Sequence, residues 1–307
     1  MAGLLKRLIT YQKERFPILV HLPLIAAFSF SAIGYSRACR GAAGFIALPN
    51  YLTCVLTNVI LFFMLRVADE HKDHEDDMMY RIYLPVPRGL ISLKELSRLA
   101  KWLFAFATFI NVLLFPSLLG LYALMMAYLL LMRYEFFIPN WLKKHQVAYI
   151  VSHMLIIPLA DIYASSYDWK LGNAAPPSGL LFFFAVSFFN GISLEIGRKI
   201  RIPEKEEPGV LSYTKLWGLK TAPLVWMLVL AANFAMAWIC LVHAHYGSQS
   251  FYILSVLFLL SCLPALLFVS KPSYKKTKLI ELISLVWAIG MYLLLGGIPL
   301  LIQLLSR

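Results

Sequence analysis

The chain has 307 residues, of which 60% are hydrophobic and 14% are charged, and its formal net charge is +12. Soluble globular proteins carry roughly a quarter charged residues, so this composition excludes a soluble domain and indicates a membrane protein. The positive charge would suit a nucleic-acid partner, but the Lys and Arg residues are spread between long apolar runs instead of forming one patch, which excludes nucleic acid.

The first segment, residues 1–16, mixes Lys and Arg with apolar residues. It lacks the small-residue cleavage site of a secretory signal peptide. We therefore expect an amphipathic helix that lies on the membrane surface.

Nine apolar runs of about twenty residues follow, which is the length that a helix needs to cross a bilayer. An open sheet would leave backbone groups unpaired in lipid, and the alternating pattern of a membrane β-barrel is not visible. The sequence therefore predicts an all-α integral membrane protein, in which residues 1–307 form a single domain with nine transmembrane helices. The expected spans are 17–36, 46–67, 97–116, 118–133, 146–166, 177–196, 222–243, 251–270 and 279–304.

The basic residues follow a strict alternation along the chain. All Lys and Arg residues lie in the N-terminal segment and in every second loop, except Arg37, Arg40, Lys170 and Arg307. Because basic loops stay in the cytoplasm, we expect the N-terminus inside and the C-terminus outside the cell (inner) membrane. One span more or fewer would break the alternation, so it also supports the number nine.

The loop 66–98 begins with an acidic run directly after an apolar span, so the helix is expected to continue out of the membrane. Asp69, Asp73 and Asp77 are spaced i, i+4, i+8 and would share one face of that helix. Like charges at this spacing repel unless a cation lies against them. Carboxylate oxygens without any cysteine are the ligands that Mg²⁺ prefers, so the run predicts a magnesium site; the alternative is a solvated charged loop.

A turn is expected at Pro85-Val-Pro-Arg-Gly89, because two prolines and a glycine cannot continue a helix. Ser92, with Glu95 three residues later, predicts the N-cap of the next helix. Arg88 has no role in this turn and is free to meet an anion.

The loop 190–220 contains the second acidic cluster, with Glu195 at a helix end and Arg198 and Lys199 one turn later. A carboxylate beside cations suits a metal and a phosphate held together. The alternative is an intrahelical ion pair, worth a few tenths of a kcal/mol. In the fifth span, His153 and Asp161 are candidates because ionisable residues inside a membrane are usually functional.

Three stretches together resemble the UbiA superfamily of intramembrane prenyltransferases: the acidic run 69–77, the turn 85–89, and Tyr213-Thr-Lys-Leu-Trp-Gly218. The resemblance covers most of the chain, and it implies a central lipid-open cavity capped by the cytoplasmic loops 66–98 and 190–220. In that family, Mg²⁺ ions at two aspartate-rich motifs hold an isoprenoid diphosphate. This chain departs from the pattern, because Leu65 and Arg66 replace Asn-Asp in one register of the first motif. In the second motif Glu195 and Lys199 replace two aspartates.

The resemblance assigns roles to individual residues. Lys144 is included because the stretch 134–146 resembles a divergent form of the family's Tyr-Pro…Lys-Arg…Gln stretch. The expected catalytic residues are Asp69, Asp73, Glu195 and Lys199. The expected magnesium ligands are Asp69, Asp73, Asp77 and Glu195. The residues expected to bind the substrate are Arg66, Lys72, Arg88, Lys144, Arg198 and Lys199.

The resemblance implies an Mg²⁺-dependent enzyme that transfers an isoprenyl group from its diphosphate, of geranyl to geranylgeranyl length or longer, to a lipophilic, aromatic acceptor. An alternative is a UbiA-type terpene cyclase, which ionises and cyclises the same substrate without an acceptor. A more remote alternative is a membrane transporter. The acidic residues argue against a transporter, since they lie at the membrane face rather than at mid-span.

Overall fold

The computed structural model describes residues 3–306, and in this range nine helical segments are long and apolar enough to cross a membrane. They coincide with the nine predicted spans, so the predicted all-α, nine-helix architecture is confirmed. The spanning helices are α2 (Ile18–Cys39), α3 (Leu48–Lys72), α5 (Leu93–Leu114), α6 (Leu119–Arg133), α8 with α9 (Gln146–Met154 and Ile156–Trp169), α10 (Gly179–Gly197), α12 (Thr221–His243), α13 (Ser248–Ser270) and α14 with α15 (Tyr274–Tyr292 and Ile298–Leu305).

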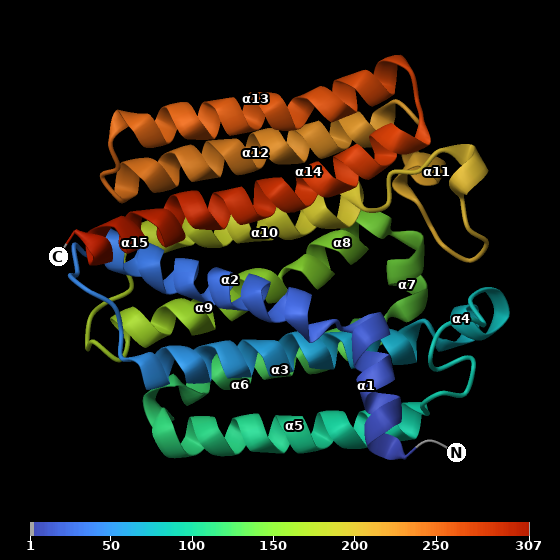
Figure 1. Ribbon diagram of the computed structural model, residues 1–307, viewed down its shortest axis with the longest axis horizontal. Helices are drawn as coiled ribbons and strands as arrows, with labels where there is room; N and C mark the ends of the chain where they lie inside the picture. The colour runs from blue at the N-terminus through green and yellow to red at the C-terminus, as the bar shows by residue number, and fades with distance from the viewer. Residues whose placement is uncertain (1–2, 307) are drawn as a thin grey trace.

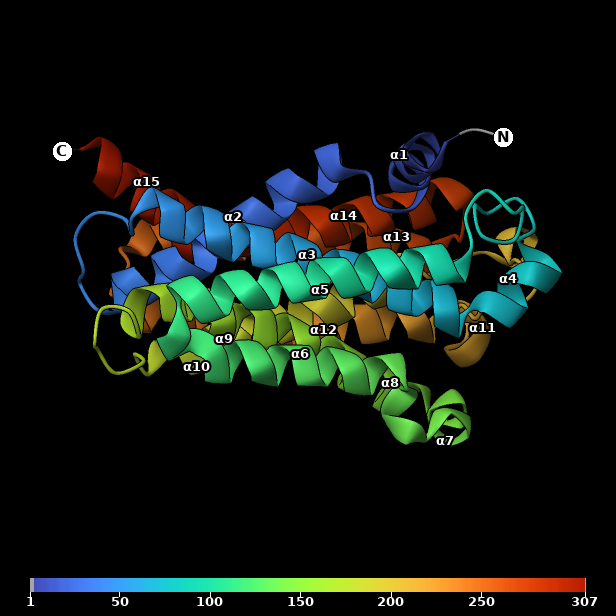
Figure 2. The same ribbon diagram turned by 90° about the horizontal axis from the view of Figure 1, so that it is seen from below.

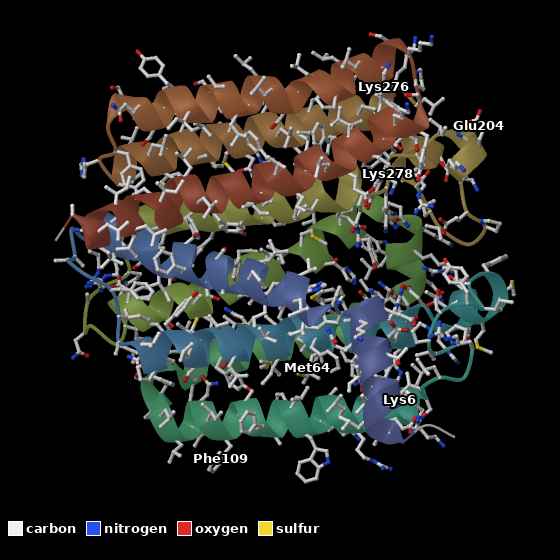
Figure 3. The ribbon with its side chains drawn as sticks, viewed as in Figure 1. Lys6, Met64, Phe109, Glu204, Lys276 and Lys278 are labelled. Atoms are coloured by element: carbon white, nitrogen blue, oxygen red, sulfur yellow. The ribbon has the colours of Figure 1, made fainter. Side chains whose placement is uncertain are left out.

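The spanning helices lie side by side along the long axis of the molecule (Figures 1 and 2). The short helices gather at one end, which also carries the N-terminus, while the C-terminus lies at the opposite end. We call the first of these the loop end; its helices are α1 (Leu4–Arg15), α4 (His74–Tyr80), α7 (Pro139–Lys144) and α11 (Tyr213–Trp217). Lys6, Glu204, Lys276 and Lys278 all lie there (Figure 3). It is the end that the charge pattern predicts to face the cytoplasm.

Two glycines allow the first and last spans to touch. A side chain on Gly296 would lie 1.9 Å from the carbonyl oxygen of Ser31 in α2, and one on Gly34 would lie 2.4 Å from the carbonyl oxygen of Gly296. Small residues let membrane helices approach closely, which replaces the hydrophobic driving force that lipid does not supply. The contact lies where the helix widens into a π-helical turn, Leu293–Gly297.

A buried ion cluster joins α2 to α9 at the end opposite the loop end. Asp168 has a fully buried side chain, and it accepts hydrogen bonds from Ser36 (2.7 Å), Arg37 (2.8 Å) and Arg40 (3.0 Å). We call these four residues the Asp168 cluster. A charge in this position is tolerated because it is both paired and hydrogen-bonded.

The predicted N-terminal helix forms as α1 and lies across the loop end of the bundle (Figure 1). Tyr11 is the buried residue of α1, and Arg15 of the same helix forms an ion pair with the buried Glu70 of α3 at 2.6 Å. The predicted N-cap is also confirmed: Ser92 and Glu95 exchange both bonds of a capping box at the start of α5. Glu95 additionally pairs with Arg7, which fastens α1 to α5.

Candidate functional site

The end of α3 carries a cluster of alternating charges. Lys72 lies 3.5 Å from Asp69 and 3.9 Å from Asp73, and Arg66 lies 3.8 Å from Asp69. Lys72 also donates a hydrogen bond to the phenolic oxygen of Tyr149 in α8. The side chains of Asp69 and Asp73 are 46% and 35% exposed. Because their ion-pair distances are long, both carboxylates keep oxygens available for a ligand.

The end of α10 carries a much tighter cluster. One carboxylate oxygen of Glu195 is bound by Arg198, whose Nε lies 2.8 Å away, and the other lies 2.7 Å from the ammonium of Lys199. Tyr213 of α11 also donates a hydrogen bond to Glu195, at 3.4 Å. Glu195 is 5% exposed, and both its carboxylate oxygens already have partners within the protein. Arg198, Lys199 and Tyr213 therefore hold the buried Glu195 carboxylate in a fixed position.

The two clusters meet across the loop end. Burial lowers the pKa of the Arg198 guanidinium, but the charges of Glu195 and Asp69 raise that pKa by more. Arg198 therefore stays charged between a carboxylate of its own helix and one of α3. The influence of Asp69 on Arg198 indicates that the end of α3 lies near the end of α10. Arg66 and Lys72 pair with carboxylates at the end of α3, and Arg198 and Lys199 pair with Glu195 at the end of α10.

Three predicted site residues lie elsewhere. The chain bends at Asp73, so the acidic face expected to run through Asp77 is interrupted. Asp77 is buried against Arg81, and burial raises its pKa. Arg88 pairs with Glu14 of α1 at 2.7 Å and belongs to the contact that holds α1. Lys144 is exposed at the end of α7.

A cavity of about 710 Å³ begins beside the α10 cluster. Glu195 and Arg198 line its polar side, together with Lys278 and Glu281 at the start of α14. Its remaining walls are largely apolar and come from α8, α9, α10 and α14, at Met154, Ile157, Leu194, Leu282 and Leu285. Leu282 is 54% and Leu285 is 38% exposed on the outside of the bundle, so the cavity reaches the surface where lipid would lie.

The arrangement has counterparts among solved structures. A digeranylgeranylglyceryl phosphate synthase superposes with a TM-score of 0.64 at 14% identity, over 96% of this chain and 99% of that one. A UbiA homolog from Aeropyrum pernix K1 gives a TM-score of 0.62 at 17% identity, over 88% and 96% of the two chains. The chain has the UbiA fold. Comparisons with models of known protein families and with curated protein sequences find no match.

Within this UbiA fold, two aromatic residues of the site were not among the sequence-predicted residues. Tyr149 contacts Lys72, and its ring stacks on His153 with 4.0 Å between the ring centroids. Tyr213 bonds Glu195. Tyr149 is 77 positions away from Lys72, and no local spacing reveals such a contact. Tyr213 opens the stretch that carried the family resemblance, which was the available signal.

Proposed function

We propose that this chain is a divergent member of the UbiA superfamily and transfers an isoprenyl group from its diphosphate to a lipophilic, aromatic acceptor inside the membrane. The observation that carries the proposal is the position of Arg198. It lines, with Glu195, the polar side of a largely apolar cavity that reaches the lipid-facing surface, and Lys199 lies 2.7 Å from the same Glu195 carboxylate. A diphosphate with a long hydrocarbon tail has the matching distribution of charge and apolar surface.

Magnesium is the cofactor that we propose, and Asp69 and Asp73 fit it. No three carboxylate, imidazole or thiol side chains within residues 3–306 form a metal site by themselves. Mg²⁺ does not need such a cage, because it usually binds one or two carboxylates together with substrate phosphates. When bound there, Mg²⁺ would neutralise charge on the diphosphate. Glu195 fits this role poorly, since Arg198 and Lys199 occupy its oxygens.

Cationic side chains of the protein would assist the departure of the diphosphate. The bond between carbon 1 of the isoprenyl group and the diphosphate oxygen breaks, and its electron pair leaves with the diphosphate. Lys72 of α3, together with Arg198 and Lys199 at the end of α10, would stabilise the charge that develops on this leaving group. The remaining allylic cation bonds to a ring carbon of the acceptor, and the proton that the ring loses passes to the diphosphate. Cation–π contacts with nearby rings such as Tyr149 would stabilise the cation.

The metal assignment predicts different responses from two carboxylates. Asp73→Asn is expected to raise the Mg²⁺ concentration for half-maximal activity by at least about tenfold, as losses of metal-supporting groups do. Glu195→Gln is expected to leave that concentration unchanged, because its partners are Arg198 and Lys199. Activity is measured over a series of Mg²⁺ concentrations. A large increase for Glu195→Gln would instead assign Glu195 to the metal.

The reaction itself is tested by product analysis. Purified protein in detergent is incubated with geranyl, farnesyl or geranylgeranyl diphosphate and Mg²⁺, with and without a hydroxylated aromatic lipid. We expect diphosphate release that depends on the acceptor, with the prenylated acceptor as product. Cyclic hydrocarbon formed without acceptor would identify a terpene cyclase instead. Uptake into proteoliposomes without chemical change would identify a transporter.

A further inference from the structure

A cationic pocket lies between α3 and α5, outside the candidate site. It has a volume of about 360 Å³ and is lined by His71, Leu93, Lys94, Ser97, Arg98 and Lys101. His71 and Ser97 are joined by a hydrogen bond of 2.7 Å across the two helices. None of these residues belongs to the charge clusters of α3 or α10 described above.

The cations of this pocket gather on one helix face without a carboxylate to neutralise them. Lys94, Arg98 and Lys101 follow at i, i+4 and i+7 and so share one face of α5. In the part of the chain that the structure describes, none of the three lies within salt-bridge distance of an acidic side chain. Glu95, the nearest acid in sequence, is bound to Arg7 instead. The pocket therefore offers three uncompensated charges to an anion.

Beyond the pocket, an adjacent face of α5 that begins beside Arg98 forms an apolar stripe. Trp102, Phe106, Phe109 and Leu113 follow Arg98 at intervals of three or four residues, and they are 71%, 48%, 64% and 64% exposed. Figure 3 shows Phe109 pointing away from the bundle. Of the nine spans, α5 has the smallest buried share in its 18-residue apolar window, 22%. A cationic pocket above an exposed apolar stripe matches the head and tails of one amphiphile, and tryptophan is typical of the headgroup level.

We propose that this pocket binds the phosphate of an anionic phospholipid, whose acyl chains lie along the stripe from Trp102 to Leu113. Basic pockets between membrane helices at the cytoplasmic side bind such headgroups, with about 1 kcal/mol from each Lys or Arg near the surface. Each charge then contributes about fivefold to affinity, and three charges contribute on the order of a hundredfold. The site is independent of the proposed enzymatic function.

Native mass spectrometry of the purified full-length protein tests the proposal. After delipidation, the protein is titrated with phosphatidylglycerol or with phosphatidylcholine of the same chain length. We expect one phosphatidylglycerol to be retained in preference to phosphatidylcholine. Lys94→Gln/Arg98→Gln/Lys101→Gln is expected to weaken that retention on the order of a hundredfold. Lys215→Gln/Lys220→Gln/Lys275→Gln removes the same charge from exposed positions of the loop end and is expected to retain the lipid.

Further measurements distinguish a bound lipid from a soluble phosphate and from a second copy of the protein. Ser97→Leu keeps all three charges but fills the pocket, and it is expected to lose the preference for phosphatidylglycerol without any change of net charge. Inorganic diphosphate added in excess is expected not to displace the lipid; displacement would assign the pocket to a soluble phosphate and overturn the lipid. Equal retention by the Lys94, Arg98 and Lys101 variant and the wild type would overturn the site. So would a dimer that covers the stripe and holds no lipid.

Discussion

Asp69→Asn is expected to lower the rate of isoprenyl diphosphate cleavage by at least about 100-fold, while the protein still inserts and folds. Lys72 and Arg66 lie beside Asp69 in α3, and the charge of Asp69 contributes to the raised pKa of Arg198 at the end of α10. Asp69 would act through the Mg²⁺ that it holds, and removal of one group that stabilises charge on a leaving group typically costs roughly 100- to 1000-fold in rate. Asparagine keeps the shape of the side chain and removes the charge.

The measurement is diphosphate released by purified protein under saturating substrate and Mg²⁺. Glu75→Gln is the matched control, because Glu75 is an exposed carboxylate of the neighbouring helix α4. Its rate is expected to equal that of the wild type. If Asp69→Asn retained full activity, or if the wild type were equally active in excess EDTA, the proposed site would be wrong. Size-exclusion elution at the wild-type volume confirms that the variant is folded.

The spans were predictable because the bilayer imposes a length and an apolar composition on every crossing helix. Each apolar run of the sequence therefore became a helix, and the N-cap at Ser92 and Glu95 followed from a local signal. Glu195 was predictable for a similar reason, since Arg198 and Lys199 lie three and four residues on and meet it on the same helix. The interactions that determine these features are made between residues within a few turns of one helix.

The positions and ion-pair partners of Asp77 and Arg88 were not predictable in this way. Asp77 could share a face with Asp69 and Asp73 only if α3 continued straight, but the chain bends at Asp73. Arg88 is taken up by Glu14, 74 positions earlier in the chain. The outcome for Arg88 depends on where α1 packs, and the residues around Arg88 carry no signal for that contact. A charged residue in a loop can form ion pairs of similar free energy with several partners, so its partner is hard to predict. An apolar segment in lipid must form a helix, because its backbone groups have no other hydrogen-bond partners.

The balance of charge at the site explains how the chain departs from the pattern of the family that it resembles. A buried carboxylate costs free energy unless it is paired. At the end of α10 the pairing comes from Arg198 and Lys199, so Glu195 serves to position two cations. At the end of α3 the pairing is loose, and the carboxylates stay accessible. One side of the proposed diphosphate site would thus rely on a metal and the other on side-chain cations.

Asp168→Asn is expected to give the largest loss of stability among single charge substitutions in this chain. The side chain of Asp168 is fully buried, and the side chains of Arg37 and Arg40 that bind it are 12% and 22% exposed. Loss of one partner from a buried ion pair costs about 3–5 kcal/mol, because the remaining charge is left uncompensated. Here two guanidinium groups would lose their shared carboxylate. For a protein of this size we expect the Tm to fall on the order of 5–10 °C.

Thermal unfolding in one detergent, followed by intrinsic fluorescence, measures this effect. Glu281→Gln is the control, because its pair with Lys278 is exposed and such pairs contribute less than about 1 kcal/mol. Arg40→Met is expected to cost less than Asp168→Asn, since Arg37 still neutralises Asp168 after that change. Equal Tm values for Asp168→Asn and Glu281→Gln would show that the cluster does not hold α2 against α9. The predicted order, Asp168→Asn below Arg40→Met below Glu281→Gln, follows from how much buried charge each substitution leaves without a partner.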